Sequence, residues 1–278
     1  MIDRYAVFGN PIAHSKSPQL QMQFAQQTGE AIEYTAQLVE KDQFKQATKT
    51  FFNNGGKGLN ITVPFKEEAF NFVDTLTPRA QLAGAVNTLY RGDDNIIIGD
   101  NTDGAGLMDD MLNNLGWKLN DKKILIVGAG GAVRGIIEPL IQKKPNHITI
   151  VNRTLSKAQT LCDVFTPYYS AIDAQSFDDI NNSGAFDIII NGTSASLHGE
   201  LPPLPASILH ANSCCYDMMY GAEKTVFMQW AEKNGAAKIA DGLGMLVCQG
   251  AQSFIQWRGK KPKTAPVINQ LRLTLTEK

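Results

Sequence analysis

The chain has 278 residues, 43% hydrophobic and 19% charged, a composition typical of a globular protein with about two domains. Its net charge of −1, from 26 Lys and Arg against 27 Asp and Glu, lacks the basic excess of most nucleic-acid-binding proteins. No run of 18 apolar residues predicts a membrane span, and the N-terminus lacks the apolar core of a signal peptide. The four cysteines show no CxxC spacing, and with the four histidines they form no metal-ligand pattern. We therefore expect a cytoplasmic protein with reduced cysteines that binds no metal, nucleic acid or membrane.

The first hundred residues alternate between strands and helices. The turn RGDDN at 91–95 predicts a hairpin, so the sheet should be mostly parallel with at least one antiparallel pair. Strands are predicted at 4–9, 32–39, 59–63, 85–90 and 95–100.

Three helices connect these strands. The first is predicted over 17–29, with Ser17 as its N-cap, Pro18 at its first position and Gly29 at its end. The second, over 42–54, should be capped by Asp42, and a third lies near 66–72. The glycine-rich GGKG that follows the second helix should break the chain before the next strand.

The second half of the chain shows a different, βαβ succession. Residues 102–116 predict a helix suited to joining two domains, and KKILIVGAGGAVRGIIEPLI then predicts a buried strand, a glycine-rich turn and a helix. A strand at HITIVNRT, a helix at SKAQTLCDVF and strands at AFDIIINGTS and SCCYDMMY follow. This order predicts a doubly wound parallel sheet of the Rossmann type. No element is predicted for 170–184 or 196–212.

The glycine-rich turn has the chemistry of a dinucleotide site. In GAGGAV, Gly128 and Gly130 fit the GxGxxG pattern, whereas Val133 replaces the last glycine or alanine. Glycines let the backbone approach a pyrophosphate, which then meets free N–H groups at a helix N-terminus.

The residues after the second strand select the cofactor. NAD-binding units carry an acidic residue here to bind the ribose hydroxyl. This chain has Asn152, Arg153 and Thr154, with Lys157 close behind, and a guanidinium can bind a 2′-phosphate. We therefore predict NADP. The predicted domains are 1–101 for substrate and 102–241 for NADP, with helices in about 242–278 packing back on the first.

Polar residues follow the strands of the first domain. The carboxyl ends of strands in an open α/β sheet are where ligands bind. We expect these side chains to converge on a small polyhydroxylated acid: Ser15, Ser17, Asn60, Thr62, Lys66, Asn87 and Asp103. Hydride transfer to a ketone leaves negative charge on its oxygen, so a proton donor is needed. Lys66 can supply that proton, and Asp103 can orient the ammonium group.

The motifs VFGNPIAHSKSP, NITVPFKEEA, AGAVNTL, GDNTDG, GAGGAVRG, NRT, YDMMY and ADGLGMLVCQGAQSF together resemble the shikimate dehydrogenase family nearly end to end. The resemblance implies reversible NADP-dependent reduction of 3-dehydroshikimate to shikimate, in the chorismate route to aromatic amino acids. It also implies a monomer or homodimer. Departures from the pattern are Gly192 and Ala195 in NGTSAS, and Pro78.

The resemblance also implies roles for individual residues. Ser15, Ser17 and Tyr220 would hold the substrate carboxylate. The ring oxygens would be held or acted on by Thr62, Lys66, Asn87, Asp103 and Gln249. The NADP contacts would be Gly128, Ala129, Gly130, Gly131, Ala132, Val133, the segment Asn152 to Lys157, Met218 and Gly242.

Three alternatives are weighed at the level of sequence. A glutamyl-tRNA-reductase-like enzyme would need a nucleophilic cysteine in its N-terminal domain, and the chain has none before Cys162. A quinate/shikimate dehydrogenase would accept a broader range of substrates or use NAD. A non-catalytic NADP-sensing protein would be expected to lack the Lys–Asp pair, which this chain contains.

Overall fold

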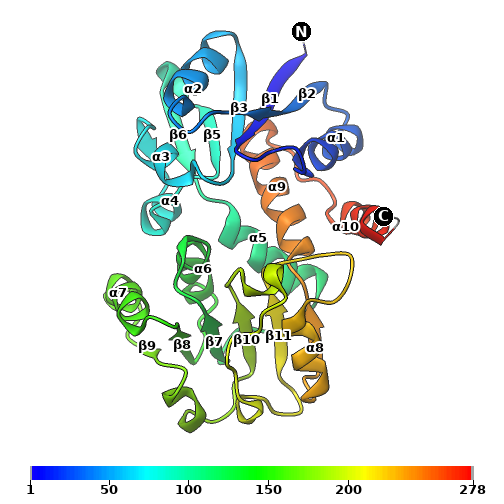
Figure 1. The fold of residues 1–278 in the computed structure, drawn as a ribbon. Coiled ribbons are helices and arrows are strands. Elements are labelled where there is room, and N and C mark those ends of the chain that lie inside the picture. Colours follow the sequence, from blue (N-terminus) through cyan, green and yellow to red (C-terminus); the bar gives the residue numbers. More distant parts are fainter. Residues whose placement is uncertain (1, 277–278) are drawn as a thin grey trace. The chain divides into compact units, whose positions relative to one another are not determined.

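The computed structural model describes residues 2–276, so residue 1 and residues 277–278, the ends of the predicted ranges, lie outside it. The chain forms two compact units (Figure 1), made of residues 2–106 with 246–268 and of residues 107–245 with 269–276. It passes between them within three helices: α5 (Asp103–Asp109), α9 (Leu243–Arg258) and α10 (Ala265–Thr276).

The first unit contains a six-stranded mixed sheet in the order β2-β1-β3-β5-β6-β4. β1 is parallel to β2 and β3, and β4 is parallel to β6, whereas β5 is antiparallel to β3 and β6. The predicted hairpin and mostly parallel sheet are therefore confirmed. The strands are β1 (Asp3–Gly9), β2 (Ile32–Leu38), β3 (Gly56–Ile61), β4 (Thr75–Leu76), β5 (Thr88–Arg91) and β6 (Ile97–Asp100).

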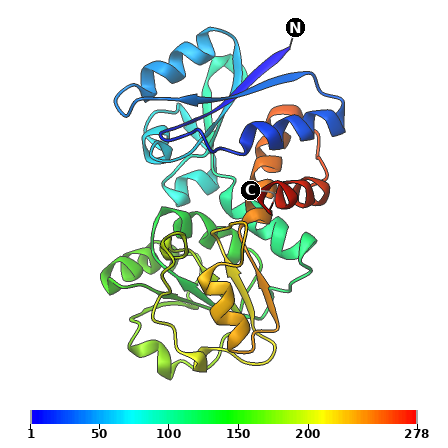
Figure 2. The ribbon, with the colours of Figure 1, turned by 45° about the vertical axis from the view of Figure 1, so that its right-hand side comes forward.

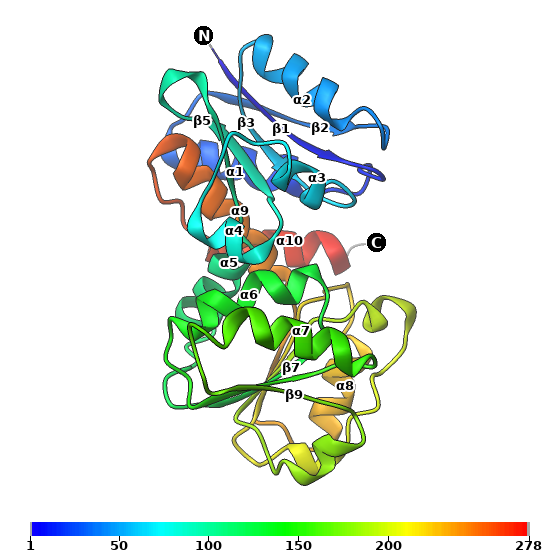
Figure 3. The same ribbon diagram turned by 90° about the vertical axis from the view of Figure 1, so that its left-hand side faces the viewer.

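Helices cover both faces of this sheet (Figure 3), because alternate side chains of its strands point to opposite faces. Phe8 on β1 joins the buried cluster that contains Phe44 and Phe65, on the side of α2 (Phe44–Asn53), α3 (Lys66–Phe70) and α4 (Pro78–Ala83). Tyr5 points the other way and stacks on Trp257 of α9, with ring centroids 4.7 Å apart. The helix α1 (Ser17–Thr28) packs against β1 and β2.

Three local predictions for the first unit are wrong. Ser17 is the first helical residue, not the N-cap; Lys16 precedes it and makes no side-chain cap. The second helix begins at Phe44 after Gln43, not at an Asp42 cap, because residues 40–43 form a turn closed by a bond from Gln43 N to Glu40 O.

The third concerns GGKG, whose last three residues belong to β3, where they pair with β1 instead of breaking the chain. Position 58 requires glycine, because a Cβ there would lie 2.4 Å from the Trp257 indole nitrogen.

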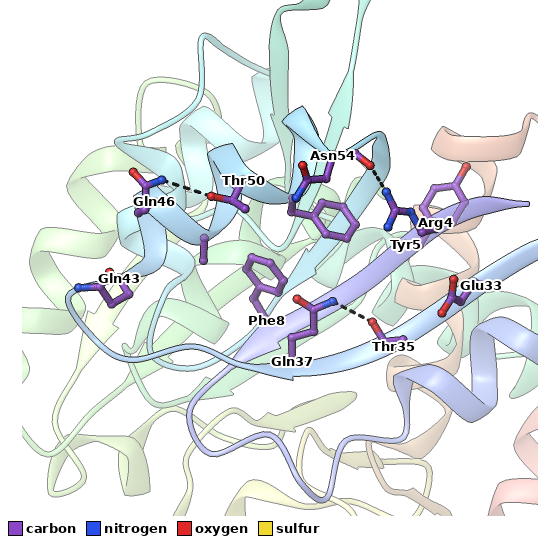
Figure 4. Close-up of a pocket in the computed structure, with 12 residues that line it drawn as sticks. Arg4, Tyr5, Phe8, Glu33, Thr35, Gln37, Gln43, Gln46, Thr50 and Asn54 are labelled. Atoms are coloured by element: carbon purple, nitrogen blue, oxygen red, sulfur yellow. Dashed lines mark hydrogen bonds between the residues drawn. The ribbon is translucent and has the colours of Figure 1, made fainter.

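A groove lies between α2 and strands β1 and β2 (Figure 4), lined mostly by polar side chains. Gln37 donates to Thr35 at 3.0 Å, and Gln46 donates to Thr50 at 3.2 Å. These four side chains thus hydrogen-bond to one another within the groove. No residue predicted for the catalytic site lines it.

The second unit is a six-stranded sheet in the order β12-β11-β10-β7-β8-β9, with all neighbouring strands parallel. Counted from its first strand, this is the 3-2-1-4-5-6 order of the Rossmann fold, which confirms the predicted doubly wound sheet. The strands are β7 (Lys123–Val127), β8 (His147–Val151), β9 (Ile172–Gln175), β10 (Ile188–Asn191), β11 (Cys214–Asp217) and β12 (Lys238–Ala240).

Helices α6 (Gly131–Ile141) and α7 (Leu155–Phe165) lie on one face of this sheet, and α8 (Val226–Lys233) lies on the other, in front in Figure 2. The helix predicted over 102–116 is α5 followed by a π-helical turn, Asp110–Asn114. The segments without predicted elements contain β9 and short 3₁₀ turns, including Asp179–Asn182 and Ala206–Ile208. Within residues 2–276, no helix is both long and apolar enough to cross a membrane.

Candidate active site

One edge of the first sheet gathers the predicted catalytic residues. β1 and β3 are parallel neighbours, and the chain after each is joined by bonds from Thr62 N to Phe8 O and from Asn10 N to Val63 O, both 3.0 Å. Ser15 follows β1, and Lys66 opens α3 after β3. The two segments therefore leave the sheet at the same edge.

β5 and β6 deliver two further residues to this edge. β5 runs opposite to β3, so Asn87, just before β5, lies beside the end of β3, and its backbone carbonyl accepts a hydrogen bond from Ile61 N at 2.8 Å. Asp103 follows β6 and is the first residue of α5. Because β5 and β6 form a hairpin, the start of β5 and the end of β6 lie at the same edge of the sheet.

Lys66 and Asp103 form an ion pair at this edge. Lys66 Nζ lies 2.6 Å from Asp103 Oδ2, and the side chains are 31% and 12% exposed. Asn87 Nδ2 donates to the other oxygen, Asp103 Oδ1, at 2.7 Å. Both carboxylate oxygens are engaged, so the carboxylate has a fixed orientation while the ammonium keeps access to a ligand.

Gln249 approaches the same cluster from α9. Its Oε1 lies 3.4 Å from both Asn87 Nδ2 and Thr102 Oγ1, and its Nε2 donates to Leu246 O at 3.0 Å. A residue far along the chain therefore extends the polar surface around the ion pair.

The remaining predicted residues of this unit differ in burial. Ser15, Ser17 and Thr62 are half-buried, and Ser15 Oγ accepts the amide of Ser17 at 3.3 Å. Asn60 is only 6% exposed, and its carboxamide bonds to protein groups on both sides, including the Tyr34 hydroxyl at 2.7 Å. Asn60 thus lies beneath the surface that the other residues form.

The glycine-rich turn of the second unit has open space over a helix N-terminus. Gly128 follows β7 and has a φ of 109°, a conformation that favours glycine, and Gly130 immediately precedes α6. A Cβ on Gly130 or Gly131 would meet no atom within 4 Å. The first N–H groups of α6 are therefore accessible to an anion such as a pyrophosphate, with Ala129 and Ala132 beside them.

The departure at Val133 has a structural counterpart at Gly192. Val133 is fully buried, and a Cβ on Gly192 would lie 2.3 Å from its Cγ2 and 3.2 Å from Met218 Sδ. Thr193, next in the chain, lies against Gly128: its Cγ2 would be 3.1 Å from a Cβ there. The segment after β10 therefore borders the dinucleotide turn. In the sequence, this segment could have been recognised by the NGT at 191–193, which follows a buried strand.

An unpaired cationic surface follows β8. Asn152 Nδ2 donates to Thr154 O at 2.9 Å, which closes the turn, and Arg153 and Lys157 are exposed. Neither cation forms an ion pair with the described part of the chain. Both are free to bind a phosphate.

Met218, Gly242 and Tyr220 follow the last two strands. Gly242 N donates to Met219 O at 3.0 Å, and a Cβ on Gly242 would lie 2.1 Å from Met218 O, so only glycine fits. Burial and the Asp241 carboxylate raise the pKa of Tyr220. Its hydroxyl therefore stays protonated and can donate to an anion.

Other chemistries have little support. All four cysteines are free, and burial raises the pKa of Cys162 and of Cys215 to about 12, so these thiols are poor nucleophiles. No cluster of three or more His, Cys, Asp or Glu side chains suited to a metal ion occurs in residues 2–276.

Three family models match successive parts of the chain. The model described as the shikimate dehydrogenase substrate binding domain matches residues 7–89. Shikimate / quinate 5-dehydrogenase matches 110–198, and the shikimate 5′-dehydrogenase C-terminal domain matches 242–272. The chain belongs to the shikimate dehydrogenase family.

Known proteins resemble this chain over nearly all of its length. The shikimate dehydrogenase (NADP(+)) of Cellvibrio japonicus is 56% identical, with both chains covered completely. An Ael1 enzyme from Pseudomonas putida has a similar structure, with a TM-score of 0.92 and 43% identity over 97% of this chain and 98% of that one.

A shikimate 5-dehydrogenase from Thermus thermophilus, solved with NADP(H) and shikimate, gives a TM-score of 0.87 at 29% identity over 99% of this chain and 100% of that one.

Proposed function

We propose that this protein is an NADP-dependent shikimate dehydrogenase that reversibly reduces 3-dehydroshikimate to shikimate. The observation that carries the proposal is the 2.6 Å ion pair between Lys66 and Asp103, whose carboxylate is held by Asn87 at the edge of the first sheet. The membership of the chain in the shikimate dehydrogenase family supports the same activity. The relative from Cellvibrio japonicus bears the name of the same NADP-dependent activity. Shikimate formation serves the synthesis of chorismate and the aromatic amino acids.

The ion pair supplies the proton chemistry. Bound NADPH supplies a hydride to the carbonyl carbon of the substrate. As that bond forms, the carbonyl oxygen gains an electron pair, and the Lys66 ammonium donates a proton to it. In the oxidative direction neutral Lys66 takes the hydroxyl proton. Asp103, 2.6 Å from Lys66 Nζ, holds that group in place in both directions of the reaction.

The other residues of the first unit are proposed to bind substrate. Ser15 and Ser17, with Tyr220 from the second unit, would donate hydrogen bonds to the substrate carboxylate. Thr62, Asn87 and Gln249 would bind its ring oxygens. We assign Asn60 to a structural role beneath the substrate-binding residues, because its carboxamide is already hydrogen-bonded within the protein.

The second unit is proposed to bind NADP through three surfaces. The N-terminus of α6, from Gly128 to Val133, suits the pyrophosphate, and its open space over Gly130 fits such a group. Arg153, with Asn152, Thr154 and Lys157, suits the 2′-phosphate. Met218 and Gly242 would also contact the cofactor.

A second candidate is a quinate/shikimate dehydrogenase, which the description of the model matching 110–198 also names. The test follows absorbance of reduced cofactor with shikimate or quinate, each combined with NADP or NAD. Our proposal expects the highest kcat/KM for shikimate with NADP. A higher value for quinate or for NAD would favour the alternative, and no turnover with any pair would favour the sensing protein.

We further propose that the enzyme acts in the cytoplasm as a monomer or homodimer. The family membership supports this proposal. Light scattering at working concentration gives the molar mass, and a tetramer would contradict the proposed state.

A further inference from the structure

Buried polar side chains lie beneath the candidate active site. They come from β2, β3, β5, the segment after β6, and α9, and none is more than 6% exposed. They are Tyr34, Asn60, Thr88, Thr102 and Ser253. Buried hydroxyls and amides destabilise a fold unless they are hydrogen-bonded, so their bonding pattern is constrained.

The direction of the bonds can be worked out from the backbone. The amide N–H of Thr102 can only donate, and it donates to Asn87 Oδ1 at 2.9 Å. This fixes the carboxamide, so that Nδ2 faces Asp103 Oδ1 at 2.7 Å. The Thr88 hydroxyl lies 2.9 Å from Asn87 Oδ1 and must therefore donate to it.

Ser253 on α9 contributes the next hydroxyl. Thr88 Oγ1 and Ser253 Oγ are 2.7 Å apart, a distance that requires a proton between them. The Thr88 proton is committed to Asn87, so the Ser253 proton lies between the two hydroxyls and Ser253 donates to Thr88; the Gln249 carbonyl oxygen, 3.2 Å from Ser253 Oγ, is a more distant second acceptor of the same proton.

Asn60 provides the next link. Its Nδ2 lies 3.2 Å from the Asn87 carbonyl oxygen, which can only accept, so Nδ2 is correctly placed as a donor. It also donates to Ser253 Oγ at 2.9 Å, while Asn60 Oδ1 accepts from the Tyr34 hydroxyl at 2.7 Å. Burial raises the pKa of Tyr34 well above its usual value, which keeps that hydroxyl a donor.

All donors in this chain of hydrogen bonds therefore point the same way. It runs through Tyr34, Asn60, Ser253, Thr88 and Asn87 and ends on the Asp103 carboxylate. Bonds in such a chain polarise one another, because each group that accepts becomes a better donor to the next.

We propose that Ser253 is a positioning residue for the Lys66–Asp103 pair, as the middle link of this chain. Its hydroxyl allows Thr88 to hold Asn87, and Asn87 holds Asp103 so that Oδ2 faces Lys66. The inference rests on the proposed function of the site.

The first test separates kcat from KM. Ser253→Ala should lower kcat about three- to tenfold, the effect of losing one neutral hydrogen bond, and change KM for shikimate and NADP less than about twofold. Ser213→Ala is the matched control, because Ser213 is equally buried and donates to Phe186 O at 2.6 Å in the second unit. An unchanged kcat in folded Ser253→Ala would overturn the proposal.

A pair of variants at Thr88 separates the hydroxyl from side-chain shape. Thr88→Val keeps the shape and removes the hydroxyl, whereas Thr88→Ser keeps the hydroxyl and removes a methyl group. The proposal expects Thr88→Val to lose kcat to the same extent as Ser253→Ala and Thr88→Ser to retain it. The opposite order would overturn it, because packing would then account for the effect.

A spectroscopic measurement tests the chain without relying on the substrate. The ¹H–¹⁵N signals of the Asn87 side-chain amide, assigned by their absence in Asn87→Ala, report its bond to Asp103. Ser253→Ala should shift them, and Ser213→Ala should not. If wild type failed to oxidise shikimate, the proposed function would fall, while this shift would still support the chain; an unmoved signal would overturn it.

Discussion

Val133 and Gly192 occupy one shared space beside the dinucleotide turn, and this gives a quantitative prediction. A methyl group added in Gly192→Ala would lie 2.3 Å from Val133 Cγ2, more than 1 Å inside contact distance. Overpacking of this kind costs about 1–3 kcal/mol. Val133→Ala removes two methyl groups from a fully buried position, which costs a similar amount, about 1–3 kcal/mol.

The double variant should lose less stability than the sum. In Gly192→Ala with Val133→Ala, the new methyl group fills the place that Cγ2 vacates, so we expect a coupling of about 1 kcal/mol or more. One kcal/mol corresponds to about 2–4 °C in the Tm of a unit of this size. Each single variant should therefore melt about 2–12 °C below wild type, and the double variant should melt nearer to wild type than the summed losses would place it.

Scanning calorimetry without cofactor gives the Tm of wild type, of both single variants and of the double variant. A separate scan of wild type with NADP identifies the transition of the second unit, because bound NADP raises the Tm of that unit. Gly130→Ala is the control, because an added Cβ there meets no atom within 4 Å. Strict additivity of the two single losses would refute the reasoning, since the two side chains would then not compete for space.

Three further predictions test the proposed chemistry. Lys66→Ala should lower kcat about 10²–10⁴-fold with little change in NADP affinity, and Asp103→Asn should act in the same direction and non-additively with it; a Lys66→Ala enzyme with most of its kcat would exclude the acid/base role. Ser15→Ala should raise KM for shikimate about tenfold at nearly constant kcat, because it removes uniform binding; a loss confined to kcat would contradict carboxylate binding. Arg153→Ala should weaken NADP about ten- to a hundredfold and NAD much less, and an unchanged ratio of kcat/KM for the two cofactors would place phosphate recognition elsewhere.

Patterns of hydrophobicity were sufficient to predict the architecture. The buried runs of Ile and Val that form β7, β8 and β10 are unambiguous, and the glycine turn after Val127 orders the βαβ unit. Two-residue β4 and short β9 escaped prediction because such segments carry too little periodicity to be distinguished from loops.

Side-chain partners explain what the sequence could not show. Ser17 matches a helix-cap pattern, yet its side chain lies against the Tyr34 hydroxyl, and its own amide donates to Ser15 Oγ. Asn60 matches a ligand-binding position at the end of a strand, but its partner Ser253 lies 193 residues away. The Val133 and Gly192 departures look independent in the sequence and are complementary in space.

The packing of α9 on β1 constrains how the protein is made. Trp257 stacks on Tyr5, and Arg258 pairs with both Asp3 and Glu30, so residues separated by up to 255 positions in the chain lie against each other. Until the Rossmann unit has been translated, this face of the first sheet is covered only in part, by α1. We expect the nascent chain to depend on chaperones over that interval, and Gln249 to join the catalytic centre only after the Rossmann unit has been made.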